Sequence, residues 1–203
     1  MFVLGVDPGL SRCGYGLVAR SGDRNGTLSA LAAGVIETDP EVPIPQRLFT
    51  LHTELRALMA EYAPTVVAVE RVFFQVNAKT AVSVCQASGL ALAAAAERGC
   101  EVVQYTSNEV KLALVGYGGA TKDQVQRMVA SVLGLATPPS PPDAADALAL
   151  AVCHMHTSGL RRAVATSSAG LGGGACSDRC GGPSRHGRRS PRPSSRWPGS
   201  ATG

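Results

Sequence analysis

The stretch Gly5-Val6-Asp7-Pro8-Gly9 near the start of the chain decides how the rest of the sequence is interpreted. Residues 1–6 are almost fully apolar, which is typical of a strand buried on both faces of a sheet. Pro8 and Gly9 then interrupt strand pairing, because proline has no backbone N–H and glycine accepts positive φ. The acid at the end of this strand, Asp7, is costly to bury without a partner. It therefore either caps the turn or binds a cation.

Length and composition indicate one ordinary domain followed by a tail. The chain has 203 residues and no apolar run long enough for a transmembrane helix, so no membrane association is expected. The first residues enter a strand directly, without the charged segment that opens a signal peptide. Four cysteines stand singly in apolar contexts, as reduced core thiols do, and a cytoplasmic location is expected: Cys13, Cys85, Cys100 and Cys153.

The net charge of +4 comes from the end of the chain. Residues 159–203 hold eight arginines and one aspartate, which leaves residues 1–158 with a net charge of −3. A role with nucleic acid would therefore need a local basic surface on an acidic body. We expect a folded domain over 1–158 and a disordered tail rich in Gly, Ser, Pro and Arg over 159–203.

The first half of the chain predicts three strands followed by a helix and a fourth strand. Val3–Val6, Gly14–Ala19 and Thr27–Ile36 are joined by short turns, so they are expected to form an antiparallel meander. Prolines open a helix that continues to about residue 62, with leucines at helical spacing on one side. The apolar run 65–69 is then a buried strand reached through a helical crossover, and it lies parallel to its partner.

This fourth strand also ends in an acid, Glu70. If it neighbours the first strand, Asp7 and Glu70 emerge at the same carboxyl edge, where open α/β sheets bind ligands. The alternative is that Glu70 is a surface acid paired with Arg71. The loop that follows holds Phe73 and Phe74, which either anchor the next helix or stack on a nucleic-acid base.

The second half predicts a long helix from Lys79 to Arg98, a fifth strand over Glu101–Tyr105 and two short helices. The short helices begin at the capping boxes Thr106–Glu109 and Thr121–Gln124. Two lysines are expected near their N-terminal ends, where the helix dipole disfavours cations: Lys111 and Lys122. They are either phosphate ligands or solvated surface residues.

The last predicted helix begins at Asp143-Ala-Ala-Asp146 after a proline-rich linker. The two acids share one face of its first turn because they are three residues apart. Acids are common first-turn residues, but these two interrupt an otherwise apolar helix. If the helix packs on the sheet, its start can direct both carboxylates at a metal.

The order of elements favours an α/β fold of ribonuclease H-like type. It consists of a five-stranded mixed sheet, a three-strand antiparallel meander plus two crossover strands, flanked by helices. Four carboxylates without a histidine cluster favour hard divalent cations, Mg²⁺ or Mn²⁺. Two such ions about 4 Å apart would clamp a phosphodiester.

The motifs around the four acids also resemble RuvC-type Holliday-junction resolvases over residues 1–156. The resemblance rests on Gly-Val-Asp7-Pro-Gly, Val-Glu70-Arg-Val-Phe73, Gln-Val-Gln-Arg-Met at 124–128 and Asp143-Ala-Ala-Asp146-Ala-Leu-Ala, in that order. It implies an endodeoxyribonuclease that resolves four-way junctions by paired symmetric nicks. It also implies a homodimer that works with a branch-migration motor complex of RuvA and RuvB type.

The resemblance implies roles for individual residues as well. Catalytic and metal-binding roles, for two Mg²⁺ ions with Mn²⁺ as a substitute, fall on Asp7, Glu70, Asp143 and Asp146. Lys111 and Lys122 would lie near the scissile phosphate. Phe73 occupies the position of the family's base-stacking aromatic, and the sequence leaves open whether Phe73 or Phe74 stacks on a base. Apart from the resemblance, Arg71 and Lys79 are expected to contact DNA, because an acidic body needs local basic residues to bind it.

Three other functions remain open on the sequence. A YqgF-like ribonuclease H-fold nuclease acting on RNA would share the fold and the first acid. An actin-like ATPase or sugar kinase also has an acid after its first strand, but it needs a second domain of this kind. A non-catalytic junction-binding protein would not need all four acids.

Overall fold

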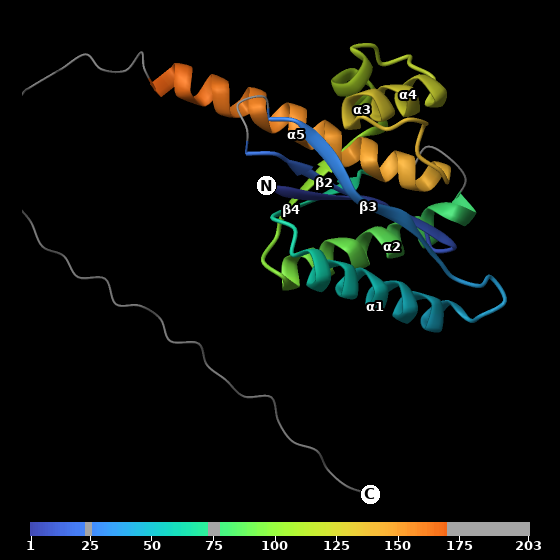
Figure 1. The fold of residues 1–203 in the computed structure, drawn as a ribbon. Coiled ribbons are helices and arrows are strands. Elements are labelled where there is room, and N and C mark those ends of the chain that lie inside the picture. Colours follow the sequence, from blue (N-terminus) through green and yellow to red (C-terminus); the bar gives the residue numbers. More distant parts are fainter. Residues whose placement is uncertain (23–25, 73–77, 170–203) are drawn as a thin grey trace, which may run out of the picture.

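The computed structural model describes residues 1–22, 26–72 and 78–169, and for 78–80 and 159–169 it describes the backbone alone (Figure 1). The strands and helices are, in chain order, β1 (Phe2–Asp7), β2 (Arg12–Arg20), β3 (Leu28–Glu37), α1 (Ile44–Tyr62), β4 (Val66–Glu70), α2 (Ala78–Glu97), β5 (Glu101–Tyr105), α3 (Ser107–Val115), α4 (Lys122–Leu133) and α5 (Pro142–Ala169). In the described part of the chain, no helix is long and apolar enough to cross a membrane.

The five strands form one mixed sheet in the order β3-β2-β1-β4-β5. The first three strands pair antiparallel, and β4 and β5 join them parallel to β1. The predicted meander with two crossover strands is confirmed. Because β1 and β4 are parallel neighbours, with Val6 opposite Val69, their carboxyl ends meet at one edge of the sheet.

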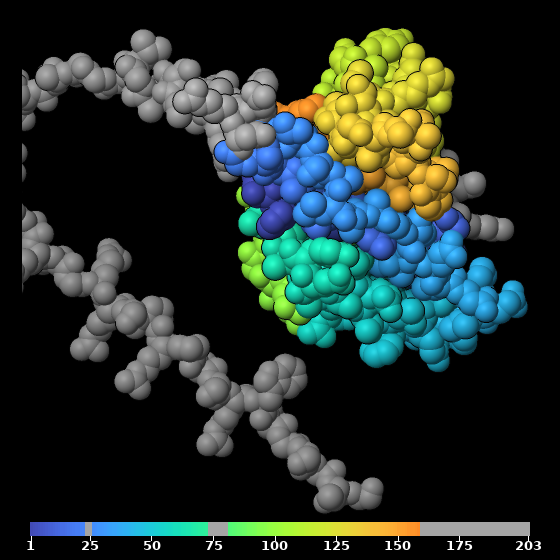
Figure 2. All heavy atoms as spheres, viewed as in Figure 1, coloured from blue at the N-terminus to red at the C-terminus, as the bar shows by residue number. Residues whose placement is uncertain are grey.

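Helices cover both faces of the sheet. Figure 1 shows α1 and α2 on one side and α3, α4 and α5 on the other. In Figure 2 the yellow atoms of α4 and the blue-green atoms of α1 form opposite sides of the molecule, with strand residues between them. Side chains of β1 alternate between two cores: Val3 packs with α5, and Leu4 packs with Leu51 and Leu55 of α1. The apolar run at the N-terminus is therefore buried on both faces, as predicted.

Helix α5 lies very close to the centre of the sheet. A Cβ atom added at Gly5 would be 1.9 Å from the carbonyl oxygen of Ala147, and one added at Gly14 would be 2.1 Å from that of Asp143. Only glycine permits such an approach of two backbones. This packing fixes the first turn of α5 against β1 and β2.

The predicted helix starts are also confirmed for α3 and α4, each of which begins with a complete capping box. Helix α5 runs further than the sequence indicated, since its backbone stays helical to Ala169, past residue 158. The rest of the predicted tail, 170–203, lies outside the described residues, so the domain boundary stays a prediction.

Candidate active site

Two acids meet at the carboxyl edge of the sheet. Asp7 ends β1 and Glu70 ends β4, and the Asp7 carboxyl donates a hydrogen bond to Glu70. Burial, followed by the negative charges of Glu70 and Asp146, raises the pKa of Asp7 from 3.8 to about 7. Burial also raises the pKa of Glu70, although its hydrogen bond with Asp7 acts in the opposite direction. The pair therefore keeps a proton up to about pH 7, whereas a separate aspartate with a pKa of 3.8 would already have lost it.

The other two acids lie in the first turn of α5 and are paired with protein cations. Asp146 Oδ2 is 2.6 Å from the Nζ of Lys122, the first residue of α4. Asp143 Oδ2 accepts a hydrogen bond from Arg12 Nε at 2.9 Å. Both aspartates also act on Asp7, since their negative charges contribute to its raised pKa. The structure therefore brings all four predicted acids into one electrostatically coupled cluster.

A cavity of about 250 Å³ opens beside this cluster. Glu70 and Asp146 line it together with both predicted lysines, Lys111 and Lys122. The remaining lining residues are Ser107, Val110, Val125, Ala149 and Leu150. The cavity is thus open to solvent, carries acids and lysines, and has an apolar wall from α3, α4 and α5.

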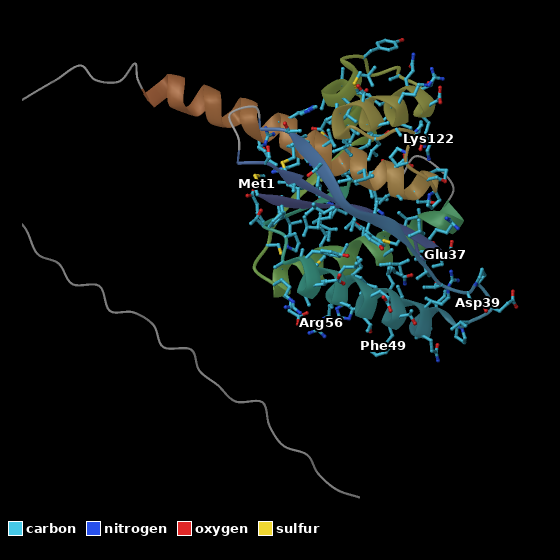
Figure 3. All side chains as sticks on the ribbon, in the orientation of Figure 1. Met1, Glu37, Asp39, Phe49, Arg56 and Lys122 are labelled. Atoms are coloured by element: carbon cyan, nitrogen blue, oxygen red, sulfur yellow. The ribbon has the colours of Figure 1, made fainter. Side chains whose placement is uncertain are left out.

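The two lysines that line this cavity come from different helices. Lys122 starts α4, as predicted, and Figure 3 shows it on the same side of the molecule as Glu37, at the end of β3. The hydrogen bond to Asp146 is the largest cause that raises the pKa of Lys122. Lys111 lies midway along α3, so the expected placement at a helix N-terminus is wrong for this residue. It faces the cavity because α3 packs against α5.

The donor set suits a hard divalent cation. Four carboxylates provide oxygen ligands. Burial and then mutual repulsion raise the pKa of Asp7, and a cation would relieve the repulsion. Among the described residues, no three Asp, Glu, His or Cys side chains already form a group arranged to hold a metal ion. In this structure Lys122 and Arg12 each pair with one of the two aspartates of α5.

The predicted DNA-contacting residues are only partly described. Arg71 is exposed directly after β4, and its backbone N–H donates to the carbonyl of Tyr105 at 2.8 Å. Phe73 and Phe74 lie outside the described residues. Lys79 belongs to α2 by its backbone, and its side chain is likewise outside the description.

Two arginines near the site were not predicted. Arg12 pairs with both Asp143 and Glu37. Arg47 of α1 is buried and donates to the hydroxyl groups of Thr38 and Ser11, at 2.9 and 2.6 Å, which holds the turn after β1. A signal for Arg47 existed in the sequence, because an arginine among the apolar positions of an amphipathic helix needs buried partners.

The sheet order and the acid-bearing carboxyl edge define a protein of the ribonuclease H-like class. Residues 3–154 match the family described as crossover junction endodeoxyribonuclease RuvC. A relative of that name from Leifsonia xyli is 52% identical over 167 residues, which cover 82% of this chain and 79% of the relative. The chain belongs to the RuvC family of crossover junction endodeoxyribonucleases.

Solved structures agree with this assignment. Thermus thermophilus RuvC has a TM-score of 0.74 and 37% identity, over 79% of this chain and 97% of that one. The same protein in complex with Holliday junction substrate has a TM-score of 0.71 and 34% identity, over 79% and 96% of the two chains. The yeast mitochondrial Holliday junction resolvase Ydc2, with a TM-score of 0.59 and 15% identity, shares the fold.

Proposed function

We propose that this protein resolves four-way DNA junctions by metal-dependent hydrolysis of phosphodiester bonds, in paired symmetric nicks. One observation carries the proposal: acids from three separate elements, β1, β4 and α5, are coupled at the edge of a cavity that also holds two lysines. This arrangement suits a polyanionic substrate and a divalent cation together. The known junction substrate of the Thermus thermophilus relative supports junction DNA as the target.

The proposed metal ligands are Asp7, Glu70, Asp143 and Asp146, which hold two Mg²⁺ ions, with Mn²⁺ as a substitute. Bound ions of this kind activate a water molecule and stabilise the leaving oxygen of the phosphodiester. The protein's part is to release the proton shared by Asp7 and Glu70 and to turn Asp146 away from Lys122. The first turn of α5 stays fixed because it packs on Gly14 of β2.

The lysines are proposed to bind the scissile strand. Lys122 is 60% exposed at its side chain and becomes free for a phosphate once Asp146 turns to a cation. Lys111 lines the same cavity from α3. Further contacts to DNA are proposed for Arg71, for Lys79 and for Phe73 or Phe74, one of which would stack on a base.

The assembly is proposed to be a homodimer, because a four-way junction is approximately two-fold symmetric and two matching nicks need two sites related by the same axis. A branch-migration motor of RuvA and RuvB type is the proposed partner complex. A cytoplasmic location fits a protein that acts on chromosomal DNA.

The test is a nicking assay on a synthetic four-way junction with labelled strands. We expect symmetric cuts with Mg²⁺ and none with EDTA, and loss of cutting with retained junction binding in the Asp146→Asn variant. A structured RNA in the same assay tests the YqgF-like alternative, which the family assignment does not favour. Cutting that persists at the wild-type rate in Asp146→Asn would contradict the proposed site.

A further inference from the structure

Arg12 connects one of the four acids to a carboxylate outside the cluster. Its Nε donates to Asp143 Oδ2 at 2.9 Å, and its Nη1 is paired with Glu37 Oε1. The side chain of Arg12 is 46% exposed and that of Asp143 is 30% exposed, so this contact lies at the rim of the site. The function proposed above gives Arg12 and Glu37 no role.

The backbone places Arg12 for both contacts. Arg12 and Glu37 are direct partners in the register of β2 and β3, so the ion pair joins neighbouring residues across two strands. Residues 12 and 14 of a strand point to the same face. Gly14 touches the backbone of Asp143 there, and Arg12, two residues away, reaches the side chain of the same residue.

The turn that precedes Arg12 is also anchored. Ser11 accepts a hydrogen bond from the buried Arg47 at 2.6 Å, and its carbonyl accepts one from the backbone N–H of Thr38 at 3.1 Å. Thr38 in turn donates its hydroxyl to the carbonyl of Leu10 at 2.6 Å. Arg12 therefore extends from a fixed backbone, unlike a surface arginine on a free loop.

We propose that Arg12, braced by Glu37, is a positioning residue that orients Asp143 toward a divalent cation. Arg12 binds one carboxylate oxygen, Oδ2, which fixes the plane of the carboxylate and leaves Oδ1 for the metal. Glu37 offsets the charge of the guanidinium, so that an incoming cation meets less repulsion. A residue that hydrogen-bonds to a metal-ligating carboxylate orients that carboxylate, and its loss lowers the affinity of the site for the metal. The inference rests on the proposed function, which makes Asp143 a metal ligand.

The test measures Mn²⁺ binding to the purified full-length protein by titration calorimetry, without DNA. We expect Arg12→Ala to weaken Mn²⁺ binding about ten-fold or more, and Glu37→Ala to weaken it less. Arg12→Lys should recover part of the loss, because it keeps a cation and a donor. The matched control is Arg56→Ala, since Arg56 has the same 46% exposure and pairs with Glu97 at 2.6 Å. Figure 3 shows it on α1, across the sheet from α5.

Thermal melts of each variant verify that it is folded before binding is compared. Folded Arg12→Ala that binds Mn²⁺ as tightly as wild type, or more tightly, would overturn the proposal and leave the Asp143 contact a surface ion pair. Wild type that binds no Mn²⁺ would overturn it too. Wild type that binds Mn²⁺ and cuts no junction would refute the proposed function, while the comparison of Arg12 variants, measured by binding, would still stand.

Discussion

Replacing Asp7 by asparagine is expected to stabilise the metal-free protein while it abolishes cleavage. The pKa of Asp7 is raised from 3.8 to about 7 by burial and by the charges of Glu70 and Asp146. Because one pKa unit corresponds to about 1.4 kcal/mol, keeping this carboxylate ionised in the folded state costs at most about 4 kcal/mol. Asparagine carries no charge, and its amide N–H can still donate to Glu70.

The sign of the pH dependence follows from the direction of the shift. Between pH 3.8 and about 7 the folded protein holds a proton at Asp7 that the unfolded chain has released. The stability contributed by Asp7 is therefore complete below pH 3.8 and is lost as the pH rises to about 7. The advantage of Asp7→Asn should be small at about pH 4 and largest at about pH 8.

Thermal unfolding in EDTA measures this effect. We expect a gain of about 2 kcal/mol at about pH 8, because Asp7 is only half-buried and solvent relieves part of the cost. This gain raises Tm by about 4–8 °C. Mg²⁺ should stabilise the wild type and not the variant. Asp39→Asn is the control, because Asp39 is exposed and only accepts a hydrogen bond from a backbone N–H. An Asp7→Asn variant no more stable than wild type at about pH 8 would refute this account of the site.

Three further variants test other parts of the structure. Arg47→Met should lower the free energy of unfolding by about 1–3 kcal/mol, seen in urea melts, because the buried hydroxyl of Thr38 and the less buried hydroxyl of Ser11 lose their donor. Gly14→Ala should unfold the protein or displace the start of α5, seen by circular dichroism and loss of nicking. Gly22→Ala should be neutral, because no atom of the described residues lies within 4 Å of the added Cβ. Lys122→Ala should slow nicking about 100-fold without weakening Mn²⁺ binding, measured by single-turnover cleavage and calorimetry.

The sequence was sufficient for the sheet and for the acids because both depend on local rules. A strand that is apolar on both faces and ends in an acid predicts where Asp7 and Glu70 emerge, and a helical crossover makes their strands parallel. Capping boxes then locate the starts of α3 and α4. Only the pairing of β1 with β4, which the sequence left as a condition, depends on a contact between distant residues.

Contacts between residues far apart in sequence were the part that could not be predicted. Arg12 and Asp143 are separated by 131 positions, and they meet because Gly14 lets α5 approach β2. Lys111 was predicted from the helix dipole, yet it reaches the cavity through the packing of α3 on α5. Such pairings depend on how the helices pack against the sheet and against one another, and the hydrophobic periodicity of the sequence does not encode this packing.

The two protein cations that pair with acids of the site differ in how firmly they hold them. Lys122 has a flexible stem, a 60% exposed side chain and one acidic partner, Asp146. Arg12 has a planar guanidinium held between Asp143 and Glu37 on an anchored strand. A cation entering the cluster should therefore displace Lys122 and leave Arg12 in place. Metal binding then releases Lys122 for the phosphate. Loss of Lys122 should therefore slow cleavage and spare metal binding. Loss of Arg12 should impair metal binding itself.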